Sequence, residues 1–476
     1  MAYVAYVTQL KNLRKHPNAD RLLLGECFGN TVCVGLEYKD PDDGGTYAYI
    51  DGEVGIYFPT DGQLSVAFCE ANNLVRKKDD AGNNIGGYMD PDKRNVTSIR
   101  LRGEKSDGLF LPLCCLTTFG DITTLKVGDT IDVFNGHEIC TKYIPRRNIR
   151  SGNGHSGVNK TRKKKAPIAP LFSEHADTEQ LAYNLGAFKP GDLVEITLKM
   201  HGTSQRTGYL PTLKGYKRTL WDRITRKDGT PIYDWGYVSG TRRVVLEDFD
   251  GGFYGSNSFR EKHSKVFEGK LRKGETVYYE VVGFTDSSTP IMATCDNKKL
   301  NDKDFIKQYG DTTTFSYGCL PFGFEVKEYE ESWVMPTMEF KPKSDIYVYR
   351  MTMTNEDGDV VEYTPDFMRY RCEQMGIKTV PVMWSGFIPE HPGSKTDPTI
   401  TAGEWIKNVA EMYYDGPDPV GKTHVREGVV VRVLNRPGFC AFKHKNFEFK
   451  CLEGIVKANA DAPDMEEAQD IENNEE

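Results

Sequence analysis

The spacing of apolar residues constrains the fold more than any other feature of this chain. Short runs in which apolar and polar residues alternate recur along the sequence, and Gly, Asp and Asn separate them. Such runs are typical of strands that bury one face, and the residues between them are typical of turns. Three segments, 178–188, 365–376 and 401–414, are predicted helices. A chain built of many strands and few helices is therefore expected.

The strand signals divide the chain into regions. Residues 1–146 contain many short strands and predict a small β-barrel or sandwich. Residues 147–167 are polar and basic and indicate a flexible linker, whereas 168–455 mix strands with helices. Within that region, 286–344 has few clear elements and indicates an insertion. Residues 456–476 are predicted to be a disordered acidic tail.

Length and composition indicate an ordinary water-soluble protein. The 476 residues suggest two or three domains with ample core. No apolar run approaches the roughly 18 residues of a membrane span. The eleven cysteines are scattered without any C-x-x-C pair, which indicates free thiols in a reducing compartment. The N-terminus has no secretory signal, so a cytoplasmic location without membrane attachment is expected.

The net charge of -8 comes from one end of the chain. From Ala458 onward there are acidic residues and no basic ones, and the eight carboxylates of this tail equal the whole net charge. The rest of the chain is therefore neutral and can carry basic surfaces. The overall charge does not exclude a nucleic-acid partner.

Lys199 lies at the end of a predicted strand, in the stretch LKMHGTSQR. An ordinary lysine has a pKa of about 10.4, so only about one in two thousand is a free amine at pH 7. A nucleophilic lysine therefore needs cationic neighbours, a metal ion or a desolvated pocket. Gly202 would allow a ligand or backbone to approach closely. By itself, K-x-H-G does not separate a nucleophile from an ordinary surface lysine.

Further polar residues interrupt predicted strands downstream. Glu280 lies within an apolar strand, where a carboxylate is costly unless it has a partner. Glu427 directly precedes Gly428 and a run of valines, and Lys443 and Lys445 share one face of a strand. The ordered series comprises Lys199, then Arg242 or Arg243, Glu280, Tyr349, Glu427, Lys443 and Lys445.

This ordered series resembles the nucleotidyltransferase motifs of the covalent ligase and capping-enzyme superfamily. It is most similar to the ATP-dependent RNA ligases, in which K-x-H-G replaces the commoner K-x-D-G. The resemblance implies that Lys199 attacks the α-phosphate of ATP, expels pyrophosphate and holds AMP. It implies that Glu280 contacts the ribose, that Tyr349 stacks on adenine, and that Glu427 binds a catalytic Mg²⁺ or Mn²⁺.

The same resemblance assigns the remaining motif residues to nucleotide binding. Lys443 and Lys445 would grip the α-phosphate and disfavour the protonated form of Lys199 by charge repulsion. His201 would bond a ribose hydroxyl, and Gly202 completes the motif. Arg242 is expected on the phosphate side, with Arg243 as the open alternative. Phosphoryl transfer needs this concentration of positive charge more than it needs further covalent chemistry.

The N-terminal region is similar to the OB-type domain that precedes the transferase in Deinococcus-type RNA ligases. The segments that carry this similarity are VGIYFPTDGQLS and SIRLRGEKSDGLFLPL, and the resemblance extends over most of 1–455. It implies an α+β protein, in which an OB-type β-barrel precedes a nucleotidyltransferase domain with antiparallel sheets. Arg100, Arg102 and Lys105 could then contribute to a nucleic-acid-binding surface.

The implied activity is the joining of 3′-hydroxyl and 5′-phosphate ends through lysyl-AMP, with ATP and a divalent metal. RNA or RNA–DNA hybrid ends, including nicked duplexes, would be the partners of a monomeric enzyme in RNA repair. A non-catalytic RNA-binding protein with a degenerate transferase is one alternative, although all the motif residues are present. A GTP-using capping enzyme is another, but it would place an OB domain after Lys445. No P-loop motif occurs.

Overall fold

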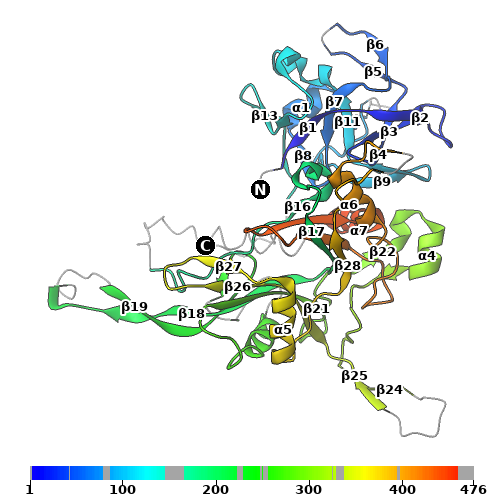
Figure 1. Ribbon diagram of the computed structural model, residues 1–476. Helices are drawn as coiled ribbons and strands as arrows, with labels where there is room; N and C mark the ends of the chain where they lie inside the picture. The colour runs from blue at the N-terminus through cyan, green and yellow to red at the C-terminus, as the bar shows by residue number, and fades with distance from the viewer. Residues whose placement is uncertain are drawn as a thin grey trace. The chain divides into compact units, whose positions relative to one another are not determined.

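The computed structural model describes residues 3–41, 43–78, 86–144, 166–221, 229–246, 249, 256–323, 325–328, 337–393 and 397–458 (Figure 1). The chain forms two compact units. The first unit comprises 1–145, 296–311 and 447–458, and the second comprises the remainder. Most of the predicted linker, and the acidic tail from 459 onward, lie outside the described residues.

Short strands form most of the first unit. They are β1 (Ala5–Gln9), β2 (Lys11–Lys15), β3 (Leu22–Cys27), β4 (Asn30–Gly35), β5 (Glu37–Lys39), β6 (Thr46–Ala48), β7 (Val54–Phe58), β8 (Gly62–Leu64), β9 (Ser98–Leu101), β10 (Glu104–Asp107), β11 (Leu109–Pro112), β12 (Thr130–Ile131), β13 (Val133–Phe134), β14 (His137–Glu138) and β15 (Cys140–Lys142). A four-stranded sheet, in the order β11-β7-β1-β12, packs with helix α1 (Val66–Ala71) around one apolar core. Among the described residues the strands pair as several small sheets and not as one closed barrel.

Two later segments also belong to the first unit, although the sequence analysis placed them in the transferase region. They contain helices α4 (Lys303–Tyr309) and α7 (Phe447–Ala458). Helix α7 buries Phe449 and Leu452 and lies against β9. Its Lys450 forms an ion pair with Asp107, the last residue of β10. The apolar pattern of a helix predicts that one face is buried, but it does not say which sheet covers that face.

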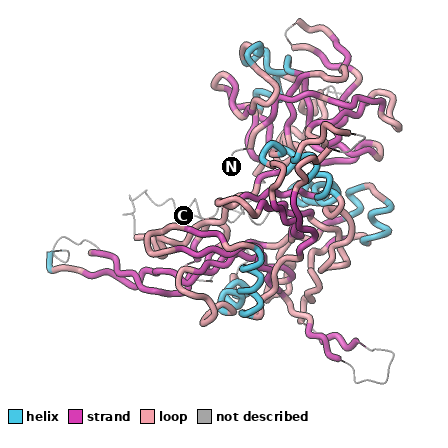
Figure 2. The backbone as a smooth tube through the Cα atoms, in the orientation of Figure 1, coloured by secondary structure: helices cyan, strands magenta, loops and turns pink. Residues whose placement is uncertain are grey.

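Two large sheets form most of the described part of the second unit, which is rich in strands (Figure 2). The five-stranded sheet, in the order β16-β30-β29-β17-β28, consists of β16 (Glu179–Gln180), β30 (Cys440–Lys445), β29 (Gly428–Val433), β17 (Leu193–Lys199) and β28 (Val382–Phe387), and β16 is parallel to β30. The six-stranded antiparallel sheet consists of β20 (Val245–Leu246), β19 (Thr230–Gly240), β18 (Thr203–Lys217), β21 (Glu275–Gly283), β26 (Ser344–Thr354) and β27 (Val360–Glu362). The remaining short strands are β22 (Cys295–Asp296), β23 (Thr312–Thr313), β24 (Glu325–Glu328) and β25 (Thr337–Phe340).

Helices cover one face of each sheet. Helix α6 (Ala402–Glu411) packs through Ile406 against the valines of β29, and Thr401 begins it with a capping box. Helices α3 (Ser258–Lys265) and α5 (Pro365–Met375) pack on the six-stranded sheet in a second core. This observed α+β architecture with antiparallel sheets agrees with the predicted fold class.

The local predictions have a mixed outcome. The helices predicted at 365–376 and 401–414 are confirmed as α5 and α6. The helix predicted at 178–188 is wrong, because this segment forms β16 and two 3-10 turns. Asn184 interrupts it: its backbone leaves the helical region at φ -126°, and its side-chain amide bonds the carbonyl of Gln180 instead. No helix within the described residues is long and apolar enough to cross a membrane.

Candidate active site

Three strands of the five-stranded sheet place the predicted nucleophile beside the predicted metal and phosphate ligands. In their register, Lys199 on β17 lies opposite Gly428 on β29, and Gly428 lies opposite Lys445 on β30. Lys443 lies two residues before Lys445 on β30, opposite Val430. Because directly opposed residues share one face of a sheet, all three lysines point to the same side.

Glu427 precedes β29 and connects these side chains. Its Oε1 lies 2.7 Å from the Nζ of Lys199 and 3.7 Å from the Nζ of Lys445. Its Oε2 lies 3.7 Å from Nδ1 of His201. Glu427 is only 2% exposed, whereas the side chain of Lys199 is 23% exposed. The carboxylate is therefore enclosed, while the lysine remains accessible to a ligand.

Two glycines allow this close packing. A Cβ atom on Gly428 would lie 2.1 Å from the carbonyl oxygen of His444, and its φ of +147° also disfavours other residues. A Cβ atom on Gly202 would lie 2.5 Å from the carbonyl oxygen of Val281 and 2.8 Å from Cγ of Glu280. Gly202, three residues after Lys199, thus lets the chain before β18 lie directly against β21 at Glu280.

An aromatic group from the predicted insertion holds His201. The backbone N–H of His201 donates a hydrogen bond of 2.6 Å to the hydroxyl of Tyr317, and its ring meets that of Phe315 edge-on at 4.7 Å. Burial raises the pKa of Tyr317 well above its usual range, and Asp418 acts in the same direction, so the phenol keeps its proton. Neither aromatic residue was predicted from the sequence, because the irregular segment around them carries no periodic signal.

The six-stranded sheet supplies the predicted ribose and base contacts. Ser204 on β18 lies opposite Glu280 on β21, and the hydroxyl of Ser204 is 3.0 Å from that of Tyr349 on β26. Glu280 is partly buried, as its place in an apolar strand predicts. The two predicted residues, Glu280 and Tyr349, therefore both adjoin Ser204.

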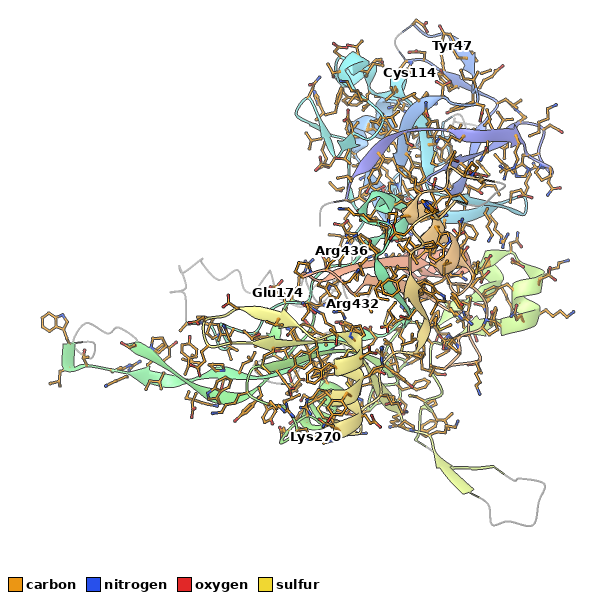
Figure 3. The ribbon with its side chains drawn as sticks, in the orientation of Figure 1. Tyr47, Cys114, Glu174, Lys270, Arg432 and Arg436 are labelled. Carbon is orange, nitrogen blue, oxygen red and sulfur yellow. The ribbon has the colours of Figure 1, made fainter. Side chains whose placement is uncertain are left out.

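His175 packs against Tyr349, with ring centroids 5.1 Å apart. Its Nδ1 lies 3.3 Å from Nη1 of Arg350, which binds Glu362 and lies 4.6 Å from the ring of Phe439. Figure 3 labels Arg432, which lies 5.0 Å from the same Phe439 ring. Burial, together with Arg350 and Arg242, lowers the pKa of His175 to about 3. A neutral imidazole therefore borders the predicted adenine-stacking residue, and no sequence motif indicated it.

Arg242 and Arg243 both engage one carboxylate, that of Asp177. Arg242 forms an ion pair with its Oδ1, and Nη2 of Arg243 lies 3.3 Å from its Oδ2. The carbonyl of Arg242 also accepts a hydrogen bond from the backbone N–H of His175. The structure thus ties both arginines to the segment before β17, and it does not separate the two candidates for the phosphate side.

The three residues predicted for nucleic-acid binding lie on the β9–β10 hairpin of the first unit. Arg100 pairs with Asp302 at 3.2 Å and with Glu448 at 2.6 Å, and Nζ of Lys105 lies 3.7 Å from Glu448. Arg102 is exposed at the turn. Two carboxylates thus neutralise the charge of Arg100. Through these ion pairs Arg100 links the β9–β10 hairpin to α7 and to the 296–311 segment of the same unit.

The donor atoms around Glu427 fit a hard divalent cation. Its Oε2 is buried without a hydrogen-bond donor, and carboxylate oxygens are the ligands that such cations prefer. Within the described residues, no group of three or more His, Cys, Asp or Glu side chains is placed to hold a metal. A cation at Glu427 would therefore take its other ligands from water and phosphate oxygens.

Comparison with solved structures identifies the fold. An RNA ligase of Naegleria gruberi, solved as a lysine-to-methionine variant with AMP and manganese, aligns with 94% of this chain and 97% of its own, at 15% identity and a TM-score of 0.50. The chain shares the fold of that ligase. Structures of the ligase with pyrophosphate and of a variant with ATP and manganese give TM-scores of 0.49, at 16% and 15% identity. The first covers 93% of this chain and 96% of its own, and the second covers 94% and 98%.

Comparisons of sequence add no relative. No family model matches the chain, and no curated protein matches it. At 15% identity the structural likeness establishes the fold alone. The assignment of chemistry therefore depends on the residues gathered around Lys199.

Proposed function

We propose that this protein is an ATP-dependent RNA ligase that works through a lysyl-AMP intermediate on Lys199. The observation that carries the proposal is the arrangement at the ends of β17, β29 and β30. The accessible amine of Lys199 lies 2.7 Å from Oε1 of the enclosed Glu427, and the amine of Lys445 lies 3.7 Å from the same oxygen. Every residue of the predicted nucleotidyltransferase series is present, either on a strand of the two sheets or in a segment that adjoins one.

In the first step, the ammonium group of Lys199 gives its proton to solvent water, and the free amine attacks the α-phosphorus of ATP. A nitrogen–phosphorus bond forms, the bond between the α-phosphorus and its bridging oxygen breaks, and pyrophosphate leaves with the electron pair. Lys443 and Lys445, on the same face as Lys199, stabilise the charge that develops on the phosphate oxygens. Glu280 and His201 are assigned to the ribose, and Tyr349 to the adenine ring.

Glu427 has two roles in this proposal. Without nucleotide it holds Lys199 in an ion pair, which fixes the direction of the amine. A bound Mg²⁺ or Mn²⁺ would neutralise phosphate charge and would engage the carboxylate that otherwise favours the ammonium form of Lys199. Tyr317 and Phe315 keep His201 in place during this exchange.

The later steps move AMP to the nucleic acid. The 5′-phosphate of one RNA end attacks the phosphorus of lysyl-AMP and releases Lys199. The 3′-hydroxyl of the other end then attacks the activated 5′-phosphate, expels AMP and forms the phosphodiester. Nicked duplexes and RNA–DNA hybrid ends are the proposed substrates, and RNA repair is the proposed setting.

The finer assignment rests on the sequence resemblance. It assigns the chain to the Deinococcus type, with an OB-type first unit and the domain limits 1–146 and 168–455. The fold shared with a Naegleria gruberi RNA ligase solved with AMP and manganese supports ligase chemistry and a divalent metal. From the sequence alone, we also propose that the enzyme is monomeric and cytoplasmic.

The test is an adenylation and joining assay with the full chain. Protein is incubated with α-labelled ATP or GTP and Mg²⁺ or Mn²⁺, and is then separated under denaturing conditions. Label from ATP that stays on the protein, and that is released as AMP when an added nicked duplex is joined, supports the proposal. Label from GTP alone indicates a capping-type transferase, and RNA binding without label indicates a non-catalytic binding protein.

A further inference from the structure

The β18–β19 hairpin extends beyond the sheet from which it arises (Figures 1 and 2). β18 pairs with β21 only from Thr203 to Gly208, but it pairs with β19 as far as Lys217 opposite Thr230. Among the described residues, the outer half is thus a two-stranded ribbon, because β21 pairs only with the first part of β18. A two-stranded ribbon is at best marginally stable by itself, so the sheet from which it arises must stabilise it.

We call the part of the hairpin beyond Gly208 and Val238 the arm; its described residues are 209–221 and 229–237. The arm carries exposed cations. Lys214, Lys217 and Arg218 are exposed, and Asp234 is the exposed carboxylate among its described residues. Within the described residues, neither Lys214 nor Lys217 has a carboxylate within 4.0 Å. Their charge is therefore available to an anionic partner.

Exposed apolar side chains accompany these cations. Trp221 is 71% exposed and Leu220 is 78% exposed, and both follow the end of β18 at Lys217. Nearer the sheet, Nζ of Lys273 lies 5.1 Å from the ring centroid of Trp235. Cations mixed with accessible aromatic rings suit a polynucleotide, which offers phosphates for the cations and bases for stacking. An acidic peptide would use the charge but not the indole.

The arm is joined directly to the candidate active site. β18 begins at Thr203, immediately after the K-x-H-G stretch that contains Lys199. At about 3.3 Å per residue, Lys217 lies up to about 45 Å from Thr203 along the strand. That length corresponds to about 13 nucleotide steps of about 3.4 Å in a duplex strand. The arm can therefore reach phosphates well away from the ends being joined.

We propose that the arm binds the RNA substrate, with Lys214, Lys217 and Arg218 on phosphates and Trp221 against a base. This inference rests on the proposed function and names the surface that holds the nucleic acid. The arm carries no residue of the nucleotide site. Its cations act on RNA affinity, and they leave the adenylation of Lys199 unchanged.

The experiment compares the full-length protein with a Lys214→Ala, Lys217→Ala, Arg218→Ala variant. Binding to a fluorescent nicked RNA duplex is measured by anisotropy over a range of salt concentrations. The variant is expected to bind about tenfold more weakly, and its log–log salt slope should fall by about 2, because each phosphate contact contributes about 0.7–0.9. A nicked duplex with only about 5 base pairs on each side of the nick should bind the variant and the wild type equally, because it is too short to reach the end of β18.

Two further variants serve as controls. A Lys214→Arg, Lys217→Arg, Arg218→Lys variant keeps the positive charge and should bind the RNA duplex with wild-type affinity. Removal of Lys299, Lys303 and Lys307, exposed cations of the 296–311 segment, deletes equal charge elsewhere and should leave the salt slope unchanged. Trp221→Ala should weaken binding without altering the slope.

Equal RNA affinity and salt slope in the triple-alanine variant and the wild type would overturn the inference. Adenylation of each variant with labelled ATP is measured in parallel. Normal adenylation together with unchanged RNA binding would reject the proposed role of the arm in RNA binding. It would leave the ligase proposal intact. Absent adenylation in the wild type rejects the ligase proposal, whatever the arm does.

Discussion

Glu427 has an unusual set of neighbours. It is nearly fully buried, yet two lysines and a histidine lie within 3.7 Å of its oxygens. A buried carboxylate surrounded in this way is costly unless its partners and ligands compensate its charge. In the proposed mechanism a metal ion would replace Lys199 at this carboxylate, so that its charge would stay compensated throughout.

Lys445→Ala is expected to slow the adenylation of Lys199 by about 10²–10³-fold, because it removes one charge from the developing phosphate. Lys443→Ala should have an effect of the same size. Single-turnover transfer of label from α-labelled ATP measures the rate, and thermal unfolding shows whether the variants fold. Lys378→Ala, which removes an exposed partner of Asp345 on the same unit, is the control. Wild-type adenylation rates in both lysine variants would contradict their assignment.

At the scale of elements, the packing of β29 on β30 determines whether Glu427 and Lys445 meet. Gly428→Ala would place a methyl group 2.1 Å from the His444 carbonyl and should push the strands apart. We expect it to lower the thermal unfolding temperature and to abolish adenylation. Gly438→Ala is the matched control, because its Cβ would meet nothing within 4 Å. Equal unfolding temperatures for the two variants would show that the strands tolerate the methyl group.

Helix α3 should make stability depend on pH. Burial, together with Lys262, lowers the pKa of His263 to about 4, while its Nε2 lies 2.8 Å from the hydroxyl of Ser344. The unfolded chain binds this proton below about pH 6.5 and the folded chain does not, so stability falls as pH decreases from 6.5 toward 4. His263→Gln should reduce that fall by up to about 1.4 kcal/mol per pH unit, measured by denaturant unfolding at pH 7, 6 and 5. An unchanged slope would show that His263 does not resist protonation.

The sequence predicted the strands that carry the site because alternation is a local property. β17, β21, β26, β29 and β30 lie where the motifs had placed them. Tyr317 and His175 were not predicted, since their contacts with His201 and Tyr349 join segments over a hundred residues apart. The segment 178–188 was assigned to a helix because its apolar spacing outweighed the turn-forming Asn184 and Gly186.

At the scale of the whole molecule, the chain completes its first unit with its last described helix. Helix α7 contributes the buried Phe449 and Leu452, and Lys457 reaches Asp61 at 2.9 Å. Truncation after Asn446 should therefore destabilise the first unit and make it susceptible to limited proteolysis. Truncation after Ala458 keeps α7 and is the control. Equal protection of 3–144 in the two truncated chains would show that α7 is dispensable to that unit.

The central claim concerns one covalent bond, and intact-protein mass spectrometry tests it most directly. After incubation with ATP and Mg²⁺ or Mn²⁺, the wild-type protein should gain one adenylyl group, which peptide mapping should locate on Lys199. Lys199→Ala should gain none while it remains folded. A wild-type protein without this increment under either metal, or an adduct that persists in Lys199→Ala, would contradict the account.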